Sequence, residues 1–268
     1  MLKCLQINLH HSRAAALNLS QLILDNNYDV VLIQEPYATS SPVLNLFSIP
    51  TGYSSFHSLS KNHAFGAAIL AKTSLRASCV PFASSNHFTG IKLSYKNSDL
   101  LLFSLYLRPS LANVASEMET CISSIPAKYI PFSLIGCDSN AHSPLWNSCN
   151  LSPAGSNVES VITDFQLNIA NRSKDLLNFV PLGTFFVDIT LNGDNTEIKN
   201  WCFLNEPSLS DHPFISFNML VPQCVRTSAC PRSARSCTPP PPSLCDLDRF
   251  YKLLPELIIK LPSPKVIS

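Results

Sequence analysis

The feature that most restricts the fold is a series of short apolar runs, rich in Val, Ile, Leu and Phe, which alternate with helical patterns and turn clusters. Runs of this length and composition predict buried strands. The predicted strands are 3–9, 29–34, 64–71, 89–95, 100–107, 131–137, 185–191 and 212–220. Because strands and helices mix without strict β-α-β repetition, two mixed sheets covered by helices fit better than a doubly wound parallel sheet.

Apolar spacing also predicts helices between these strands. In residues 12–26, apolar side chains recur four, seven and eight positions apart, which is the pattern of one helical face. These side chains are Ala15, Leu19, Leu22 and Ile23. Residues 113–125 form a second predicted helix, and Ser156 with Glu159 forms a capping box that predicts the start of a third.

Composition excludes several classes of protein. Apolar residues make up 46% and charged residues 14% of the 268 residues, so the chain can bury a sizeable core. The formal net charge of +1 excludes a basic nucleic-acid arm, and any contact with nucleic acid must come from a local patch. No apolar stretch reaches the roughly 18 residues of a membrane span, and the N-terminus lacks a secretory signal pattern. We therefore expect neither secretion nor a membrane partner.

The ten cysteines indicate the redox compartment. Cys4, Cys79, Cys121 and Cys137 each lie inside an apolar run. That placement predicts buried free thiols in a reducing compartment, which is nuclear or cytoplasmic.

A change of composition divides the chain. Residues 1–221 carry the strand and helix patterns, and 222–245 form a Pro- and Cys-rich stretch without periodicity, which predicts a linker. Residues 246–268 have helical spacing but too few neighbours for a domain of their own. We expect this segment to be the start of a downstream region that the chain does not contain, so the chain would be a fragment of a longer polyprotein or a stand-alone remnant.

Polar residues stand at the ends of the predicted strands. They are Asn8, Glu35, Tyr106, Arg108, Asp138, Asn140, Asp188, Asp211 and His212. Each alone has an ordinary explanation, because a Glu before Pro usually ends a strand and a lone Asn usually lies in a turn. Together, acids, amides and an imidazole at the ends of buried strands indicate a convergent polar site on a rigid scaffold.

The order of these residues resembles the endonuclease/exonuclease/phosphatase superfamily, and within it the endonuclease domain of non-LTR (LINE-type) retrotransposons. The resemblance covers roughly residues 1 to 220. It is carried by the blocks "QINLHHSRAA", "IQEPY", "YLRPS", "GCDSNAHSPLW", "VDITL" and "LSDHPFISF". It implies an α/β fold, a four-layer sandwich of two mixed β-sheets flanked by helices, as in deoxyribonuclease I.

The resemblance also implies a role for each catalytic candidate. Asp138 would orient and deprotonate the attacking water, while Asn140 and Tyr106 would contact phosphate oxygens. His212 would hydrogen-bond or charge the phosphate, and Asp188 would fix the tautomer of His212. The spacing of two between Asp138 and Asn140 predicts that both project from one side of a strand end. We expect Asp188 and His212 to lie at the edges of neighbouring strands.

A hard divalent cation completes the implied chemistry, because it binds oxygen ligands and neutralises phosphate charge. Mg²⁺ is the expected ion, with Mn²⁺ as an alternative. Glu35 is the best direct ligand, with Asn8 and Asp211 beside it. The adjacent His10 and His11 could suggest a pair of metal ligands. We discount this, because neighbouring residues on a strand point to opposite faces.

Three further residues are candidates for binding the substrate. Arg13 and Arg108 would contact phosphates, or else are plain surface charges. His142 would contact the substrate, or else packs near Trp146.

The leading interpretation is a Mg²⁺-dependent DNA endonuclease that nicks target DNA. By the resemblance, the nick would prime target-primed reverse transcription, and the partners would be double-stranded DNA and a downstream reverse transcriptase domain. One alternative keeps the fold but acts on a non-DNA phosphoester. Another is a catalytically decayed nucleic-acid-binding remnant, against which the complete set of strand-end residues argues.

Overall fold

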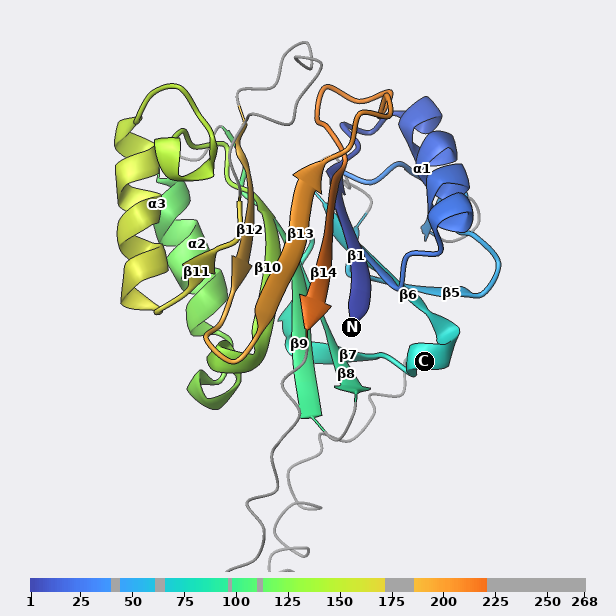
Figure 1. Cartoon of the computed structure of the whole chain (residues 1–268), viewed down its shortest axis with the longest axis horizontal. Helices are drawn as coiled ribbons and strands as arrows, with labels where there is room; N and C mark the ends of the chain where they lie inside the picture. The colour runs from blue at the N-terminus through green and yellow to red at the C-terminus, as the bar shows by residue number, and fades with distance from the viewer. Residues whose placement is uncertain (40–43, 61–65, 96–97, 110–112, 172–185, 221–268) are drawn as a thin grey trace, which may run out of the picture. The chain divides into compact units, whose positions relative to one another are not determined.

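The structure is a computed structural model that describes residues 1–39, 44–60, 66–95, 98–109, 113–171 and 186–220 (Figure 1). The predicted linker (222–245) and helical segment (246–268) lie outside the described residues, so the proposed division of the chain stays a prediction. The described residues form two six-stranded sheets, one two-stranded sheet and the helices that cover them.

The first sheet has the strand order β13-β14-β1-β2-β6-β5. Its strands are β1 (Leu2–Asn8), β2 (Val30–Gln34), β5 (Tyr53–His57), β6 (Ala67–Lys72), β13 (Glu197–Phe203) and β14 (Ile215–Leu220). β1 and β2 are parallel, whereas β14 runs antiparallel to β1. The C-terminal ends of β1 and β2 therefore lie at the same edge as the start of β14.

The second sheet has the strand order β11-β12-β10-β9-β8-β7. Its strands are β7 (Ser78–Ser84), β8 (Phe88–Tyr95), β9 (Ser98–Tyr106), β10 (Ser133–Asp138), β11 (Asn168–Ile169) and β12 (Asp188–Asn192). β9 and β10 are parallel and β12 is antiparallel to β10, so Asp138 lies between Tyr106 and Asp188 in the register. A separate pair joins β3 (Ala38–Thr39) to β4 (Asn45–Leu46).

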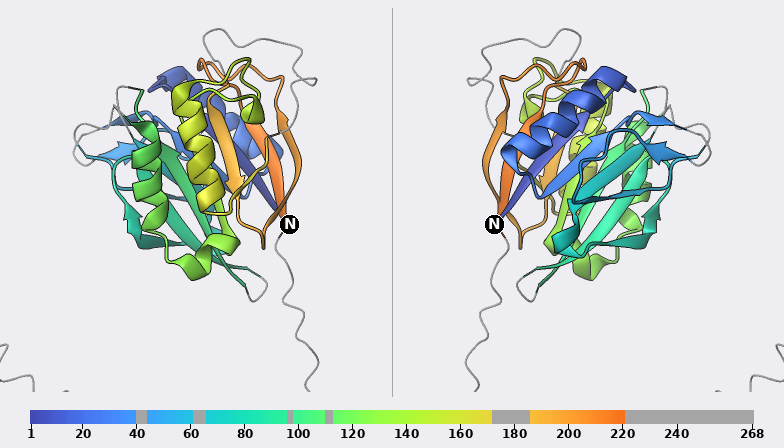
Figure 2. Two further views of the ribbon diagram at one scale, coloured as in Figure 1. Left: turned by 90° about the vertical axis from the view of Figure 1, so that its left-hand side faces the viewer. Right: turned by 90° about the vertical axis from the view of Figure 1, so that its right-hand side faces the viewer.

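Helices cover the outer face of each large sheet. They are α1 (Arg13–Asn26), α2 (Val114–Ser123) and α3 (Pro153–Asp164), with 3₁₀ turns at Thr73–Leu75, Ala127–Phe132 and Pro144–Trp146. Figure 2 shows α2 and α3 over one sheet and α1 over the other. The result is the predicted α/β sandwich of four layers, in which two mixed sheets lie between helices.

Both faces of the central strands are buried, as their continuous apolar runs predict. On β2, Leu32 packs between the two sheets and Ile33 packs under α1. On β9, Leu102 packs between the sheets and Phe103 packs under α2 and α3. The alternation of a strand thus assigns each residue to the gap between the sheets or to a helix layer.

The structure corrects one helix boundary. The capping box predicted at Ser156 is wrong, because α3 begins at Pro153 and the side chain of Ser152 accepts from the Gly155 N–H. Proline at the first helical position fixes a helical φ, which favours Ser152 as the cap. Glu159 instead accepts a hydrogen bond from the Ser143 hydroxyl.

The cysteine prediction holds for three of the four thiols. Cys4, Cys121 and Cys137 are buried and free, but Cys79 is free and exposed. Cys79 lies on the edge strand β7 next to Val80, which faces the core, so alternation turns Cys79 outward. Among the described residues, no helix is both long enough and apolar enough to cross a membrane.

Candidate active site

Strand directions bring the predicted polar residues to one edge of both sheets, the upper edge in Figure 1, where β12 and β14 begin. Asn8, Tyr106 and Asp138 end β1, β9 and β10, and Glu35 follows β2 directly. The predicted placement of Asp188 at a strand end needs a correction, because Asp188 begins β12. It reaches the same edge because β12 is antiparallel to β10.

A layer of buried polar side chains lies beneath the site, between the sheets. Gln6 donates to the Cys137 carbonyl (3.4 Å) and accepts from the Thr190 hydroxyl (2.9 Å). Gln34 donates to the Ser104 hydroxyl (2.9 Å) and to the Gly136 carbonyl (3.1 Å). These cross-sheet bonds hold the two strand ends in a fixed relation, although Gln34 Oε1 has no hydrogen-bond partner among the described residues.

The sequence interpretation missed this layer, although the sequence carries a signal for it. Gln6, Gln34 and Ser104 each stand inside an apolar run that was read only as a buried strand. Gln6 and Ser104 stand two residues before Asn8 and Tyr106, and Thr190 stands two residues after Asp188. A spacing of two means the same face of a strand, so each polar pair points into the gap between the sheets.

Three titratable groups meet at the centre of the edge. The carboxylates of Asp138 and Asp188 and the imidazole of His212 each offer one atom within 4.8 Å of the others. His212 Nδ1 lies 2.7 Å from Asp188 Oδ2. The expectation of neighbouring strands is wrong here, because Asp188 belongs to the second sheet and His212 precedes β14 of the first sheet. The hydrogen bond between these two side chains therefore links the two sheets at this edge.

Burial and mutual charge shift the pKa values in this cluster. Burial disfavours the ionised Asp138 carboxylate, and the nearby Asp188 adds negative charge, which together raise the pKa of Asp138 to about 7. Burial acts to lower the pKa of His212, but the charge and hydrogen bond of Asp188 outweigh it and raise that pKa to about 10. His212 is therefore a cation and Asp138 is poised to exchange a proton near neutral pH.

Glu35 lies on the other side of Asn8 from Asp138. The Asn8 Nδ2 atom donates to Glu35 Oε2 (3.0 Å) and to Asp138 Oδ2 (2.7 Å), so one amide positions both carboxylates. Burial opposes ionisation of Glu35, but hydrogen bonds from His11, Asn8 and Tyr106 hold its pKa below the ordinary value. Burial and the neighbouring Glu35 charge raise the pKa of the Tyr106 hydroxyl, which stays protonated as a donor.

Asn140 lies in the site by a route other than the one predicted. β10 ends at Asp138, and Asn140 has a left-handed φ of 46°, so strand alternation does not extend to it. Its backbone N–H donates to Asp138 Oδ1 (3.1 Å) and its Nδ2 donates to the Leu107 carbonyl (2.7 Å). Glu35 has a similar φ of 44°. Non-glycine residues adopt this conformation uncommonly, and such strain is concentrated at functional sites.

The adjacent histidines do not lie on a strand, which corrects the reason given against a metal pair. His10 and His11 follow β1 with φ values of 46° and 52°. His10 Nδ1 lies 3.0 Å from Asp211 Oδ1, and His11 Nε2 lies 3.4 Å from Glu35 Oε1. Each histidine thus accompanies a different carboxylate at the rim, a role that the sequence interpretation missed.

The three candidates for substrate binding lie farther out. Arg13 is exposed at the start of α1, with its guanidinium carbon 5.0 Å from the centre of the Phe47 ring. Arg108 is half-buried two residues past Tyr106, and its charge acts to lower the Tyr106 pKa. His142 is half-buried, with Nδ1 3.4 Å from the Ser148 hydroxyl. Their contacts with a substrate stay predictions.

Comparison with known proteins adds an independent observation. Residues 100–216 match the family model described as "Endonuclease-reverse transcriptase". The solved endonuclease domain of TRAS1, a telomere-specific non-LTR retrotransposon, superimposes with a TM-score of 0.71 at 22% identity. The superposition covers 83% of this chain and 99% of that chain. The chain has the endonuclease/exonuclease/phosphatase fold.

Two further solved structures share this fold. The mannosyl-6-phosphatase Bt3783 of Bacteroides thetaiotaomicron VPI-5482 superimposes with a TM-score of 0.58 at 12% identity, covering 82% of this chain and 100% of that one. D. rerio TDP2 complexed with single strand DNA product superimposes with a TM-score of 0.51 at 13% identity, covering 81% of this chain and 98% of that one. In the sequence comparison, no curated protein matches the chain. The resemblance drawn from the sequence and the predicted fold class are confirmed.

In this endonuclease/exonuclease/phosphatase fold, the edge residues suit a hard divalent cation. Among the described residues, Asp188 Oδ1 is buried without a hydrogen-bond partner, in the cluster that also holds Asp138. Carboxylate oxygens of Glu35 and Asp138 accept from one Asn8 amide nitrogen. An all-oxygen donor set of this charge matches the preference of Mg²⁺ or Mn²⁺. Asn8 Oδ1 accepts from the His10 N–H (2.8 Å), so Asn8 would have to release that bond to become a ligand.

Proposed function

We propose that the protein is a Mg²⁺-dependent endonuclease that hydrolyses one phosphodiester bond of duplex DNA and leaves 5′-phosphate and 3′-hydroxyl ends. The observation that carries the proposal is the convergence of Asp138, Asp188 and His212 with Asn8 and Glu35 at one edge of both sheets. The fold and the match to an endonuclease-reverse transcriptase family support phosphoester hydrolysis as the reaction class.

The residues of the chain divide the work of hydrolysis. Asp138, whose pKa is raised to about 7, accepts the proton of the attacking water. His212, held as a cation by Asp188, stabilises negative charge on the phosphate through its other ring nitrogen, Nε2, which lies 3.8 Å from Asp211 Oδ1. Asn140 donates one of its amide hydrogens to the Leu107 carbonyl and would donate the other to a phosphate oxygen.

Glu35 and Asp211 are the proposed ligands of the metal, with Asn8 beside them. Bound Mg²⁺ supplies neutralisation of the phosphate oxygens. The hydrogen bonds from Asn8, His11 and Tyr106 keep Glu35 ionised, which is the form that a cation requires. We further propose that the nicked 3′-hydroxyl primes reverse transcription by an associated polymerase domain.

A supercoiled plasmid tests this function. We expect Mg²⁺ and Mn²⁺ to support conversion to open circles that DNA ligase reseals, and EDTA to abolish it. Resealing reports the 5′-phosphate and 3′-hydroxyl ends. A protein that hydrolyses phosphomonoesters but leaves the plasmid supercoiled would contradict the proposal and favour the non-DNA phosphoester alternative.

A further inference from the structure

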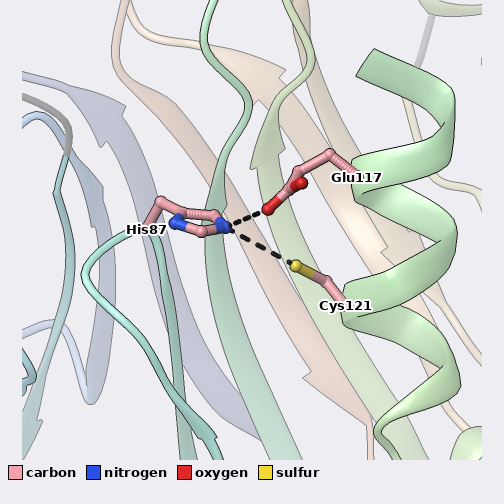
Figure 3. Close-up of side chains that lie close together, drawn as sticks. All are labelled: His87, Glu117 and Cys121. Carbon is pink, nitrogen blue, oxygen red and sulfur yellow. Dashed lines mark hydrogen bonds and ion pairs between the residues drawn. The ribbon is translucent and has the colours of Figure 1, made fainter. Parts of the chain in front are cut away.

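A second cluster of metal-binding side chains lies outside the strand-edge site. It consists of His87, in the turn before β8, with Glu117 and Cys121 on α2. Each offers a ligand atom within 4.8 Å of the other two. Figure 3 shows the three side chains pointing toward one another between the helix and the turn.

The geometry of the cluster follows from local structure. Glu117 and Cys121 are four residues apart on α2, so their side chains lie on one face, one turn apart. His87 Nε2 lies 2.6 Å from Glu117 Oε1 and 3.9 Å from Cys121 Sγ. One nitrogen, one oxygen and one sulfur therefore converge on a single point.

This convergence differs from the geometry of a nucleophilic dyad. In a catalytic triad the histidine uses one ring nitrogen for the nucleophile and the other for the orienting carboxylate. Here a single nitrogen faces both partners. Burial, together with the nearby Glu117 charge, also raises the pKa of the Cys121 thiol to about 12, which keeps the free thiol protonated and unreactive.

We propose that His87, Glu117 and Cys121 form a Zn²⁺ site separate from the strand-edge site. Thiolate, imidazole and carboxylate are the ligands that zinc takes in proteins, and the sulfur disfavours Mg²⁺. On binding, the Cys121 S–H bond breaks, an Sγ–Zn bond forms and the proton leaves to solvent. His87 would bind through Nε2 as the neutral tautomer with its ring proton on Nδ1, so the Zn–N bond replaces the hydrogen bond to Glu117. The partial exposure of the His87 and Glu117 side chains, 22% and 33%, leaves the fourth zinc position accessible to water.

A zinc ion at this point would fasten the turn to α2. The backbone next to His87 already supports the active site, because the His87 carbonyl accepts from the Tyr106 N–H (2.9 Å). The ion would thus stabilise the strand end that carries Tyr106 without touching the substrate. The strand-edge cluster offers oxygen and nitrogen atoms, so sulfur ligation distinguishes the two sites.

Cobalt substitution and zinc content of the full chain test the proposal. Co²⁺ bound through a thiolate gives a sulfur-to-metal charge-transfer band in the near ultraviolet. We expect wild type to show this band and to retain about one more zinc per chain than Cys121→Ser or His87→Gln. Glu117→Gln should weaken zinc retention, and excess Mg²⁺ should not displace the zinc.

Cys79→Ser is the matched control, because Cys79 is a free cysteine exposed on β7. It should leave the band and the zinc content at the wild-type level. Metal bound by cysteines beyond residue 220 would be common to all variants and would not change the comparison. Thermal unfolding of each variant checks that it is folded. If Cys121→Ser does not fold, His87→Gln decides the result, because the His87 side chain is partly exposed. A band and zinc content unchanged in His87→Gln, or lost equally in Cys79→Ser, would overturn the proposal.

Discussion

At the residue scale, the pairing of Asp188 with His212 gives the most specific expectation. The two are joined by one hydrogen bond of 2.7 Å, so they should act on the phosphate as one unit. Loss of such a group typically costs about 10²–10⁴-fold in rate. We predict that Asp188→Asn combined with His212→Ala is little worse than His212→Ala alone, measured by single-turnover nicking.

The cycle compares wild type, Asp188→Asn, His212→Ala and the double mutant. All four must be measured at one saturating metal concentration, so that differences in metal affinity do not affect the rates. Multiplicative losses would contradict the prediction. They would show that Asp188 acts independently of His212, most simply as a metal ligand through Oδ1, which has no hydrogen-bond partner in the described part of the chain.

The charge of His212 gives a prediction for the metal-free protein. Its pKa is raised from 6.5 to about 10, so the stabilisation from its ion pair is fully present below pH 6.5 and is lost as the pH rises toward 10. In EDTA, the imidazole NMR signals of His212 should stay in the charged position at pH 8. Asp188→Asn should lower the pKa. A wild-type imidazole that titrates near 6.5 would count against the pair.

At the element scale, the close approach of the two sheets depends on Gly136 of β10. A Cβ atom there would lie 2.7 Å from Leu32 Cδ1 and 3.0 Å from Gln6 Oε1, both on the facing sheet. We predict that Gly136→Ala destabilises the fold by about 1–3 kcal/mol, the usual range for overpacking, as measured by urea denaturation.

A second background provides the control for this substitution. Leu32→Val removes the Cδ1 atom that is in conflict, so Gly136→Ala should cost less in Leu32→Val than in wild type. Equal costs in both backgrounds would place the effect at Gln6 or in the β10 backbone instead of at Leu32.

Much of the architecture follows from local sequence patterns, since the period of apolar residues fixed the central strands and the buried face of α1. The partners of each strand did not follow, because spacing along a chain carries no information about which strands pair. Asp188 and His212 were therefore expected on neighbouring strands, although they meet across two sheets. The edge strands β5, β7 and β13 were missed because they have no continuous apolar run: β5 is half-buried along its length, and exposed residues interrupt β7 and β13.

The site residues were predictable as a set because they stand at the ends of strands. In a mixed sheet, the C-terminal end of one strand lies at the same edge as the N-terminal end of an antiparallel neighbour. Their hydrogen bonds were not predictable. The left-handed conformations of Glu35 and Asn140 depend on tertiary contacts such as the Glu35 N–H to Gly66 carbonyl bond (2.8 Å). The residues that flank Glu35 in the sequence do not indicate this backbone conformation, whereas an Asn-Gly pair does indicate a turn.

At the scale of the whole molecule, charge limits how the protein holds DNA. The 19 Lys and Arg residues are nearly balanced by 18 Asp and Glu residues, so the net charge of +1 provides no general attraction for phosphates. We predict weak, salt-sensitive binding to duplex DNA, with a log–log slope of affinity against salt of about −3, as expected for about three phosphate contacts. Fluorescence anisotropy over a salt series measures the slope.

A slope of about −8 would contradict this expectation, because it requires many more phosphate contacts. It would assign DNA binding to a basic surface outside the site, and Arg226, Arg232 and Arg235 of the predicted linker are the residues to substitute next. A control titration with single-stranded DNA separates duplex binding from general electrostatic attraction.

The most direct test of the strand-edge site is the Mg²⁺ dependence of plasmid nicking by wild type and Glu35→Gln. The substitution keeps the shape of the side chain and its bond to Asn8 but removes the charge that would hold the ion. We predict that nicking falls steeply at low Mg²⁺ and recovers in part at high Mg²⁺, while wild type is already saturated. Equal nicking by both proteins at low Mg²⁺ would remove Glu35 from the metal site and contradict the proposed mechanism.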